Sequence, residues 1–404
     1  MSPGRSHRRV KVLHVADRFV GLTENWIYPQ VTAVPQTDVA VLANTRANQR
    51  QYPFNPSRTF LNYPVWLTKF RGARGADRIA RILRTRARAE RAAKRWSPNV
   101  LHAHFGPIGY QYLNLARQCD ATLITSFYGY DAWLFPERDP IWRDRYKELF
   151  GAGDTFLVEG PAMRQRLVSL GCSEEKIVIH RLGVDCDGLE FRTRDFNPPL
   201  QIIMVGSFVA KKGLPNGLMA CAGAARSGID LAVTIVGDAP DRREESLAIK
   251  QSLHEIAATK ELQGRVRFTG YIPLDQTTAM LAEHDVMLTP SKKSADGDAE
   301  GGSPVVLTQA MAMGLICIGT RHCDIPEVIV DQVTGYLCDE GNTMQMSAAI
   351  AEIAEEPSRA NWLAVNGRMR IEEKFDLHSQ LQSQAEVYMR LSSQHEEIQY
   401  VCGS

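Results

Sequence analysis

The 404-residue sequence lacks the cysteine spacing of a zinc site or a disulfide framework. Its eight cysteines are scattered along the chain without any C-x-x-C pair. The amino-terminal segment also lacks the apolar core of a signal peptide, because only a short apolar run follows its basic residues. Both absences favour a reduced, cytoplasmic compartment, and we expect the protein not to be secreted.

Several nucleotide and metalloprotease signatures are missing as well. The sequence has no G-x-x-x-x-G-K-[ST] loop, no G-x-G-x-x-G after a strand and no H-E-x-x-H helix. A P-loop enzyme, a standard dinucleotide dehydrogenase and a zinc protease are therefore not supported. The formal net charge of +1 argues against a uniformly basic nucleic-acid-binding protein.

Short apolar runs rich in Val, Ile and Leu alternate with longer helical patterns. In the first half these runs lie at 10–16, 39–43, 99–105, 122–127 and 154–159, and the same rhythm restarts after residue 200. Continuous apolar strands that alternate with helices predict parallel sheets covered on both faces. The fold class is therefore α/β, with two successive doubly wound units.

A charged segment with paired prolines, residues 190–199, fits a linker between the two units. We therefore expect one domain over residues 1–193 and a second over 200–375. Residues from about 344 to 397 show the three- and four-residue apolar spacing of helices. Because ligands bind outside the carboxyl ends of strands in such sheets, two facing domains place the site in the cleft between them.

The most informative segment is an acidic, glycine-rich loop that ends at Ser303-Pro304. Proline suits the first turn of a helix, so a helix is predicted to begin at Pro304. The backbone N–H groups at that helix start, beside Gly301 and Gly302, can hold a phosphate or pyrophosphate. Glu300 would then accept hydrogen bonds from the hydroxyls of a sugar. The alternative is an acidic surface turn before a packed helix, and the residues alone leave both open.

Six segments, in the same order along the chain, resemble the family 4 glycosyltransferases, which are retaining enzymes with the two-domain GT-B architecture. EGGSPVVLTQAMAMGLICIGTRHCDIPEVIVDQVTGYL at 300–337 follows the family pattern E-G-x-P…E-A-M-A-x-G-x-P-V…G-x-x-E…G-x-x-G. LTENWIYPQ at 22–30 is similar to a segment of the branch that builds bacterial exopolysaccharides such as colanic acid. The other four similar segments are LHAHFGP at 101–107, SFYGYDAW at 126–133, GCSEEKIVIHRLGVD at 171–185 and VGSFVAKKG at 205–213.

The resemblance implies two Rossmann-like domains that face each other across a cleft. The N-terminal domain would bind the acceptor, the C-terminal domain would bind the donor, and a helix over about 376–404 would cross back to the first domain. The implied reaction moves a hexose from a UDP- or GDP-sugar to a glycan or lipid-linked oligosaccharide in bacterial surface polysaccharide biosynthesis. No metal or other cofactor is expected, because helix dipoles and basic side chains take the place of a cation in this architecture.

The resemblance also implies roles for individual residues. His104 would contact the transferred sugar, Lys212 would neutralise the leaving diphosphate, and Glu300 completes the catalytic set. The donor-binding residues would be Gly21, Gly206, Ser207, Lys211, Lys212, Glu300, Gly301, Gly302, Ser303, Pro304 and Gln309. The residues facing the acceptor or the sugar would be Thr23, Glu24, Tyr128 and Asp131. Taken without the family, His104 reads as a core histidine, Lys212 as a solvated lysine and Asp131 as a turn residue.

Four positions depart from the family pattern. Glu300 lies nine positions before Gln309, where the family has eight, so it fits the motif only with an extra glycine in a slightly longer loop. Gln309 replaces the second glutamate of the acidic motif, Ser207 replaces the arginine after V-G, and Tyr128 replaces the histidine of H-G-Y-D. Glutamine still forms hydrogen bonds with hydroxyls, but it carries no charge. The alternative function is therefore a catalytically weakened homologue that binds nucleotide sugars as a regulatory module.

The segment 69–95 holds eleven Lys and Arg residues but only two acidic ones. It predicts a basic amphipathic helix, which is attracted to anionic membrane surfaces. A solvated helix face and a nucleic-acid-binding tract are the alternatives, and we favour the membrane and expect no nucleic acid partner. Residues 1–200 carry 30 basic and 19 acidic side chains, whereas residues 201–404 carry 17 and 27. We therefore expect a peripheral protein at the inner face of the cell membrane whose near-zero charge is a cancellation.

Overall fold

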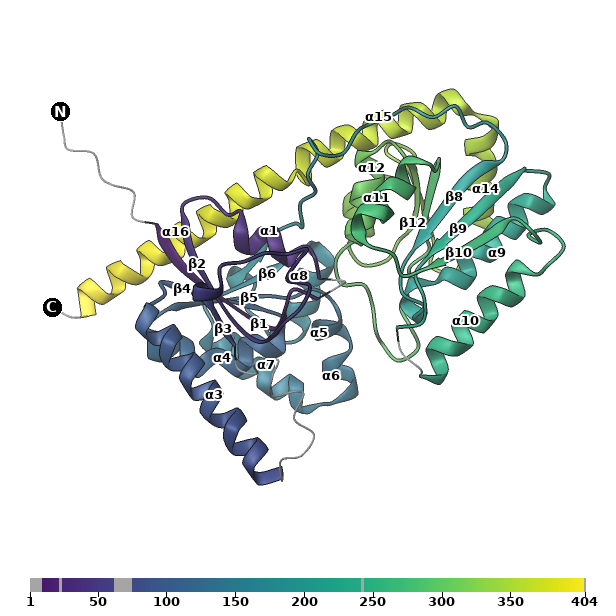
Figure 1. Cartoon of the computed structure of the whole chain (residues 1–404). Helices are drawn as coiled ribbons and strands as arrows, with labels where there is room; N and C mark the ends of the chain where they lie inside the picture. Colours follow the sequence, from purple (N-terminus) through teal and green to yellow (C-terminus); the bar gives the residue numbers. More distant parts are fainter. Residues whose placement is uncertain (1–8, 22–23, 62–74, 241–242, 403–404) are drawn as a thin grey trace, which may run out of the picture.

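The computed structural model describes residues 9–21, 24–61, 75–240 and 243–402. Two lobes are visible, each built on a parallel sheet with helices on both sides (Figure 1). The prediction of two successive doubly wound α/β units is confirmed. Among the described helices, none combines the length and the apolarity that a bilayer span requires.

The N-terminal lobe contains a sheet of seven parallel strands in the order β3-β2-β1-β4-β5-β6-β7. Its strands are β1 (Val10–Phe19), β2 (Thr37–Arg46), β3 (Thr59–Leu61), β4 (Val100–His104), β5 (Thr122–Ser126), β6 (Thr155–Val158) and β7 (Ile177–Ile179). Its helices are α1 (Ile27–Thr32), α3 (Gly75–Trp96), α4 (Gly106–Cys119), α5 (Tyr130–Trp133), α6 (Phe135–Arg138), α7 (Ile141–Ala152) and α8 (Pro161–Ser169).

Both faces of this sheet are buried, which explains why its strands read as continuous apolar runs. Leu13 and Leu101 belong to a core shared with α3, α4 and α7. Val12 and Val100, one position earlier on the same strands, pack on the opposite face in a cluster with Tyr388. Successive side chains on a strand point to opposite faces, so each apolar run supplies both cores at once.

The C-terminal lobe contains six parallel strands in the order β10-β9-β8-β11-β12-β13. Its strands are β8 (Leu200–Val205), β9 (Leu231–Val236), β10 (Val266–Gly270), β11 (Val286–Thr289), β12 (Ile316–Thr320) and β13 (Tyr336–Cys338). Its helices are α9 (Leu214–Arg226), α10 (Glu244–Ala257), α11 (Leu274–Ala282), α12 (Val305–Ala312), α13 (Ile325–Val328), α14 (Thr343–Glu355) and α15 (Pro357–Lys374).

The helical pattern at the end of the chain corresponds to three helices. The breaks fall at Glu356, before Pro357, and at Phe375. Helix α15 packs on the C-terminal core through Ala360 and Leu363. Helix α16 (Leu377–Cys402) then runs back along the N-terminal lobe, where Tyr388 is fully buried (Figure 1).

Both sheets reverse their strand order at an equivalent point. In the N-terminal sheet the reversal lies between β1 and β4, and in the C-terminal sheet it lies between β8 and β11. Ligands of doubly wound sheets bind in the crevice outside the strand ends at such a point. Phe105 follows β4 and Gly206 follows β8, and both line one cleft between the lobes.

Candidate active site

The cleft between the lobes has a volume of about 550 Å³. Half of the residues that the N-terminal lobe contributes to its wall are aromatic, and the C-terminal lobe contributes glycine, serine, aliphatic and acidic residues and both lysines. The residues from the N-terminal half are Glu24, Asn25, Trp26, Gln51, Tyr52, Phe105, Tyr128, Tyr130, Glu159 and Leu182. Of the predicted donor-site residues, the cleft is lined by Gly206, Ser207, Lys211, Lys212, Glu300, Gly302, Ser303, Pro304 and Gln309.

The loop before α12 forms much of the C-terminal wall. Pro304 is the N-cap residue of α12, which begins at Val305, one residue after the predicted start. Gly301 has a φ of 88° and packs directly on the backbone of Gly129 from the N-terminal lobe. A side chain at Gly301 would overlap Gly129, so glycine is required for both the backbone conformation and this contact.

Lys212 and Glu300 form an ion pair at the C-terminal wall, with 2.9 Å between Lys212 Nζ and a carboxylate oxygen. Lys212 lies in a single helical turn (Ala210–Lys212) that follows β8, and Glu300 lies in the loop before α12. Ser291 also donates a hydrogen bond to Glu300, over 2.7 Å. Burial opposes ionisation of Glu300, but Lys212 and Lys211 outweigh it and hold the pKa of that carboxyl below its usual range.

Lys211 is paired in a similar way, with 3.1 Å between its Nζ and Asp298 Oδ1. Both lysines of the cleft wall are therefore held by carboxylates of the same loop. Lys211 also donates to the carbonyl oxygen of Ala299 over 3.2 Å. An ammonium group has three N–H donors, so each lysine keeps at least one donor for a ligand anion. The arrangement places two cations beside the N-terminus of α12, which suits an oxyanion.

Two of the departures from the family pattern also lie at this wall. Ser207 Oγ lies 3.0 Å from the hydroxyl of Tyr271, which is also 2.9 Å from the carbonyl oxygen of Asp238. Gln309 is half-buried and lines the cleft from α12. The serine thus orders an exposed tyrosine at the edge of the cleft instead of supplying a cation.

His104 does not line the cleft. Its side chain is fully buried, Nδ1 lies 2.8 Å from the Tyr128 hydroxyl, and Nε2 lies 3.0 Å from His14 Nδ1. Tyr128 stands between His104 and the cleft and packs against Trp26 and Phe105. Burial lowers the pKa of His104 to about 3, so the imidazole is neutral.

Asp131 is an anchor for backbone rather than a wall residue. Its carboxylate accepts hydrogen bonds from the N–H groups of Gly106, Tyr128 and Gly129, at 2.9, 3.1 and 2.9 Å. These bonds join the end of β4 to the loop after β5 and so position Tyr128. Burial raises the pKa of Asp131 to about 6, although the three N–H groups act in the opposite direction.

The remaining predicted residues lie near the end of β1. Glu24 lines the cleft, and its carboxylate accepts a hydrogen bond from the N–H of Gly21 over 3.2 Å. Burial raises the pKa of the Glu24 carboxyl. Gly21 itself is buried behind Glu24, and Thr23 lies outside the described residues.

The sequence analysis overlooked several cleft residues, of which Glu159 and Tyr130 are the most prominent. Glu159 ends the predicted strand at 154–159, and a carboxylate at the end of a buried parallel strand is a signal that sequence reasoning can use. Tyr130 and Tyr52 carry no comparable signal, because aromatic side chains are as common in cores as in ligand sites.

Within the described residues, one cluster has the composition of a metal site: His14, His102 and His104. All three are buried in the N-terminal lobe. The two ring nitrogens of His102 lie 2.6 Å from the Tyr388 hydroxyl and 2.8 Å from Ser126 Oγ. The hydroxyls of Tyr128, Tyr388 and Ser126 thus account for much of the hydrogen-bonding capacity of the cluster.

Two family profiles together cover most of the chain. Residues 36–187 match "Glycosyltransferase Family 4", and residues 189–370 match "Glycosyl transferases group 1". The chain belongs to the family 4 glycosyltransferases. The resemblance read from the six segments is therefore confirmed.

Curated relatives include enzymes of bacterial exopolysaccharide synthesis. The amylovoran biosynthesis glycosyltransferase AmsK of Erwinia amylovora is 28% identical over 302 residues, which are 74% of this glycosyltransferase and 72% of the relative. The putative colanic acid biosynthesis glycosyltransferase WcaL of Escherichia coli is 32% identical over 262 residues, or 64% and 62% of the two chains.

Solved structures confirm the GT-B fold. HepE of Anabaena, solved with UDP and glucose, superposes with a TM-score of 0.74 at 16% identity, over 95% of this chain and 100% of the other. Sucrose-phosphate synthase of Thermosynechococcus elongatus gives the same TM-score, identity and coverage. At this identity the similarity establishes the fold alone, and the predicted fold class is correct.

Proposed function

We propose that this glycosyltransferase is a retaining, metal-independent hexosyltransferase that uses a UDP- or GDP-sugar. The observation that carries the proposal is the cleft of about 550 Å³, with Lys212, Lys211 and the start of α12 on one wall. A diphosphate leaving group gains negative charge in the transition state, and fixed cations and N–H groups stabilise that charge best. UDP and glucose in the crystal structure named for HepE support this class of donor.

In the proposed reaction, the acceptor hydroxyl attacks from the side on which the nucleotide leaves. The leaving phosphate takes the proton of that hydroxyl, so no side chain acts as general base. His104 is buried behind Tyr128, which makes it a residue that positions Tyr128. Lys212 stabilises the departing phosphate, and Glu300 orients Lys212 and the sugar.

We further propose that the acceptor is a glycan, carried on a lipid at the inner face of the cell membrane, in exopolysaccharide synthesis. The names of the relatives AmsK and WcaL support the pathway class. Helix α3 supports membrane contact, because Arg84, Arg88, Arg91 and Arg95 recur on its exposed side while Ala89 and Ala93 face the core. The part of the basic segment at 69–74 lies outside the described residues.

The second candidate is a weakened homologue that binds nucleotide sugars without efficient transfer. The specific observation in its favour is that Ser207 supplies no cation and that Tyr128 separates His104 from the cleft. Both candidates bind a nucleotide sugar, but only the first transfers the sugar efficiently.

Screening UDP- and GDP-sugars by thermal shift and then measuring donor hydrolysis tests both candidates. An enzyme is expected to show a ligand-induced rise in melting temperature and hydrolysis with the same donor. Binding without hydrolysis or transfer favours the weakened homologue. The absence of any shift with all UDP- and GDP-sugars contradicts both.

A further inference from the structure

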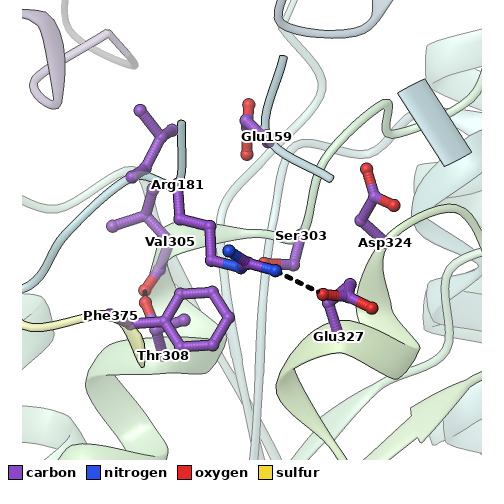
Figure 2. A pocket seen from close by; sticks show the side chains of 9 residues that line it. Glu159, Arg181, Ser303, Val305, Thr308, Asp324, Glu327 and Phe375 are labelled. Atoms are coloured by element: carbon purple, nitrogen blue, oxygen red, sulfur yellow. Dashed lines mark hydrogen bonds and ion pairs between the residues drawn. The ribbon is translucent and has the colours of Figure 1, made fainter. Parts of the chain in front are cut away.

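Glu159 is an acidic residue of the cleft to which the proposed reaction gives no role. It follows the last residue of β6 and reaches the boundary between the lobes. It lines the main cleft. It also lines a small pocket of about 10 Å³ together with Ser303 and Asp324 (Figure 2). A carboxyl at this place touches the donor wall from the opposite lobe.

The contact with the donor wall is direct. The carboxylate of Glu159 lies against the Cα of Gly302, and a Cβ at that position would overlap Oε2 and Cδ of Glu159. Gly302 is two residues from Glu300 and next to Ser303, so Glu159 faces the part of the loop where a donor sugar is expected. The side chain therefore bridges the acceptor lobe and the donor loop.

The neighbouring carboxyls have protein partners, and Glu159 differs from them. Glu300 is bonded to Lys212 and Ser291, and Asp324 Oδ1 accepts a hydrogen bond from the N–H of Ala162 over 2.8 Å. No hydrogen bond within the described residues involves the Glu159 carboxyl. Its hydrogen-bonding capacity is therefore open to a ligand in the cleft.

The electrostatic surroundings indicate which kind of ligand fits. Burial raises the pKa of Glu159 well above its usual range, and the carboxylates of Asp324, Asp131 and Glu300 raise it further. A protonated carboxyl donates one hydrogen bond and accepts others, which matches a neutral hydroxyl. The ionised carboxylate of Glu300 nearby would repel a diphosphate at this place. The surroundings thus favour a sugar hydroxyl over a phosphate.

We propose that Glu159 binds a hydroxyl of the transferred sugar from the N-terminal side of the cleft, opposite Glu300. This inference rests on the proposed function, because it requires a sugar donor in the cleft. It makes Glu159 a contact that distinguishes a nucleotide sugar from the free nucleotide. It also explains why glycine occupies position 302, since any side chain there would displace the Glu159 carboxyl.

Calorimetric titration of full-length protein with UDP-glucose against UDP, and GDP-mannose against GDP, tests the proposal. E159A is expected to weaken binding of the nucleotide sugar about tenfold and to leave the free nucleotide within about twofold. E159Q retains a donor and an acceptor, so its affinity should stay within about threefold of the wild type. D324N is the matched control, because this neighbouring carboxyl does not line the main cleft.

Two results would overturn the proposal. Equal weakening of nucleotide and nucleotide sugar by E159A would mean that Glu159 only supports the donor loop, and unchanged binding of both would mean that it contacts no ligand. If E159A does not fold, E159D replaces it, because the shorter side chain withdraws the carboxyl and should also weaken only the nucleotide sugar. Wild-type protein that binds none of the four ligands contradicts the proposed function instead.

Discussion

The two walls of the cleft differ in chemistry although they rest on sheets with equivalent strand order. The N-terminal wall carries five of the six aromatic side chains among the described lining residues, Trp26, Tyr52, Phe105, Tyr128 and Tyr130. The C-terminal wall carries Lys211 and Lys212, the cations among the described lining residues. The fold places the two walls face to face, and the side chains after each strand decide the chemistry of each wall.

The net charge of each half of the chain differs from the charge of the cleft wall that this half forms. The N-terminal half carries the excess of basic residues, yet the described cleft residues it contributes include no lysine or arginine. The acidic C-terminal half supplies both lysines. The basic excess of the first half therefore lies away from the described cleft wall, and α3 is the segment where it is concentrated.

The largest effect is expected from replacing Arg84, Arg88, Arg91 and Arg95 together with alanine. Each arginine near an anionic membrane contributes about 1 kcal/mol, so binding to phosphatidylglycerol vesicles should weaken by roughly 4 kcal/mol. Vesicle flotation measures this loss. The R226A/R265A variant, changed on the acidic half, is the control and should float like the wild type. Unchanged flotation of the quadruple variant would contradict a membrane-facing α3.

The next effect concerns the cation at the donor wall. K212A is expected to lower donor turnover about 100-fold, because it removes a charge aimed at the leaving diphosphate. Steady-state donor hydrolysis and a melting curve measure the activity and the fold. K147A, an exposed lysine on α7, serves as the control. Turnover in K212A close to that of the wild type would remove Lys212 from the site.

The elements that depend on local pattern were predictable from the sequence. The five apolar runs named in the first half form β1, β2, β4, β5 and β6, and the helix after Ser303-Pro304 starts within one residue of its predicted position. The three-residue strands β3, β7 and β13 were not predicted, because three residues cannot establish a period. All three are edge strands, and each is held in its sheet by pairing with one neighbour, β2, β6 or β12.

The part of the site that a single loop forms was predictable from the sequence. The contacts between the two lobes were not. The loop from Glu300 to Pro304 could be read from its glycines and its helix start. The burial of His104 agrees with its reading as a core histidine, but its separation from the cleft by Tyr128 could not be predicted, because Trp26, Phe105 and Tyr128 pack together from separate elements. The contact of Glu159 with Gly302 joins residues far apart in the sequence, and no local spacing encodes it.

A smaller effect concerns the carboxyl of Asp324, through which the two lobes touch. Its Oδ1 accepts the N–H of Ala162 at the start of α8, and burial raises its pKa to about 6. The unfolded chain has a pKa near 3.9, so the folded protein retains a proton that the unfolded chain loses. The contribution of Asp324 to stability is therefore largest below about pH 4, falls as the pH rises to about 6 and is then constant.

D324N removes this titration while asparagine can still cap α8. The wild type should lose on the order of 2 kcal/mol relative to D324N between about pH 4 and pH 6. Melting temperatures measured across this range, with D120N as an exposed control, report the difference. Parallel curves for D324N and the wild type would show that this carboxyl does not titrate in that window.

The smallest effects are expected from removing one tyrosine from each wall of the cleft. Tyr130 lines the N-terminal wall and Tyr271 the C-terminal wall, and both are partly exposed. Loss of an aromatic contact costs about 1 kcal/mol, so each alanine variant should weaken one ligand about fivefold. Y130A should raise KM for the glycan acceptor and leave nucleotide binding unchanged. Y271A should weaken the nucleotide and leave the acceptor KM unchanged. If both variants weakened the same ligand, the division of the cleft into an aromatic acceptor wall and a charged donor wall would be wrong, because tyrosines on opposite walls would then contact one molecule.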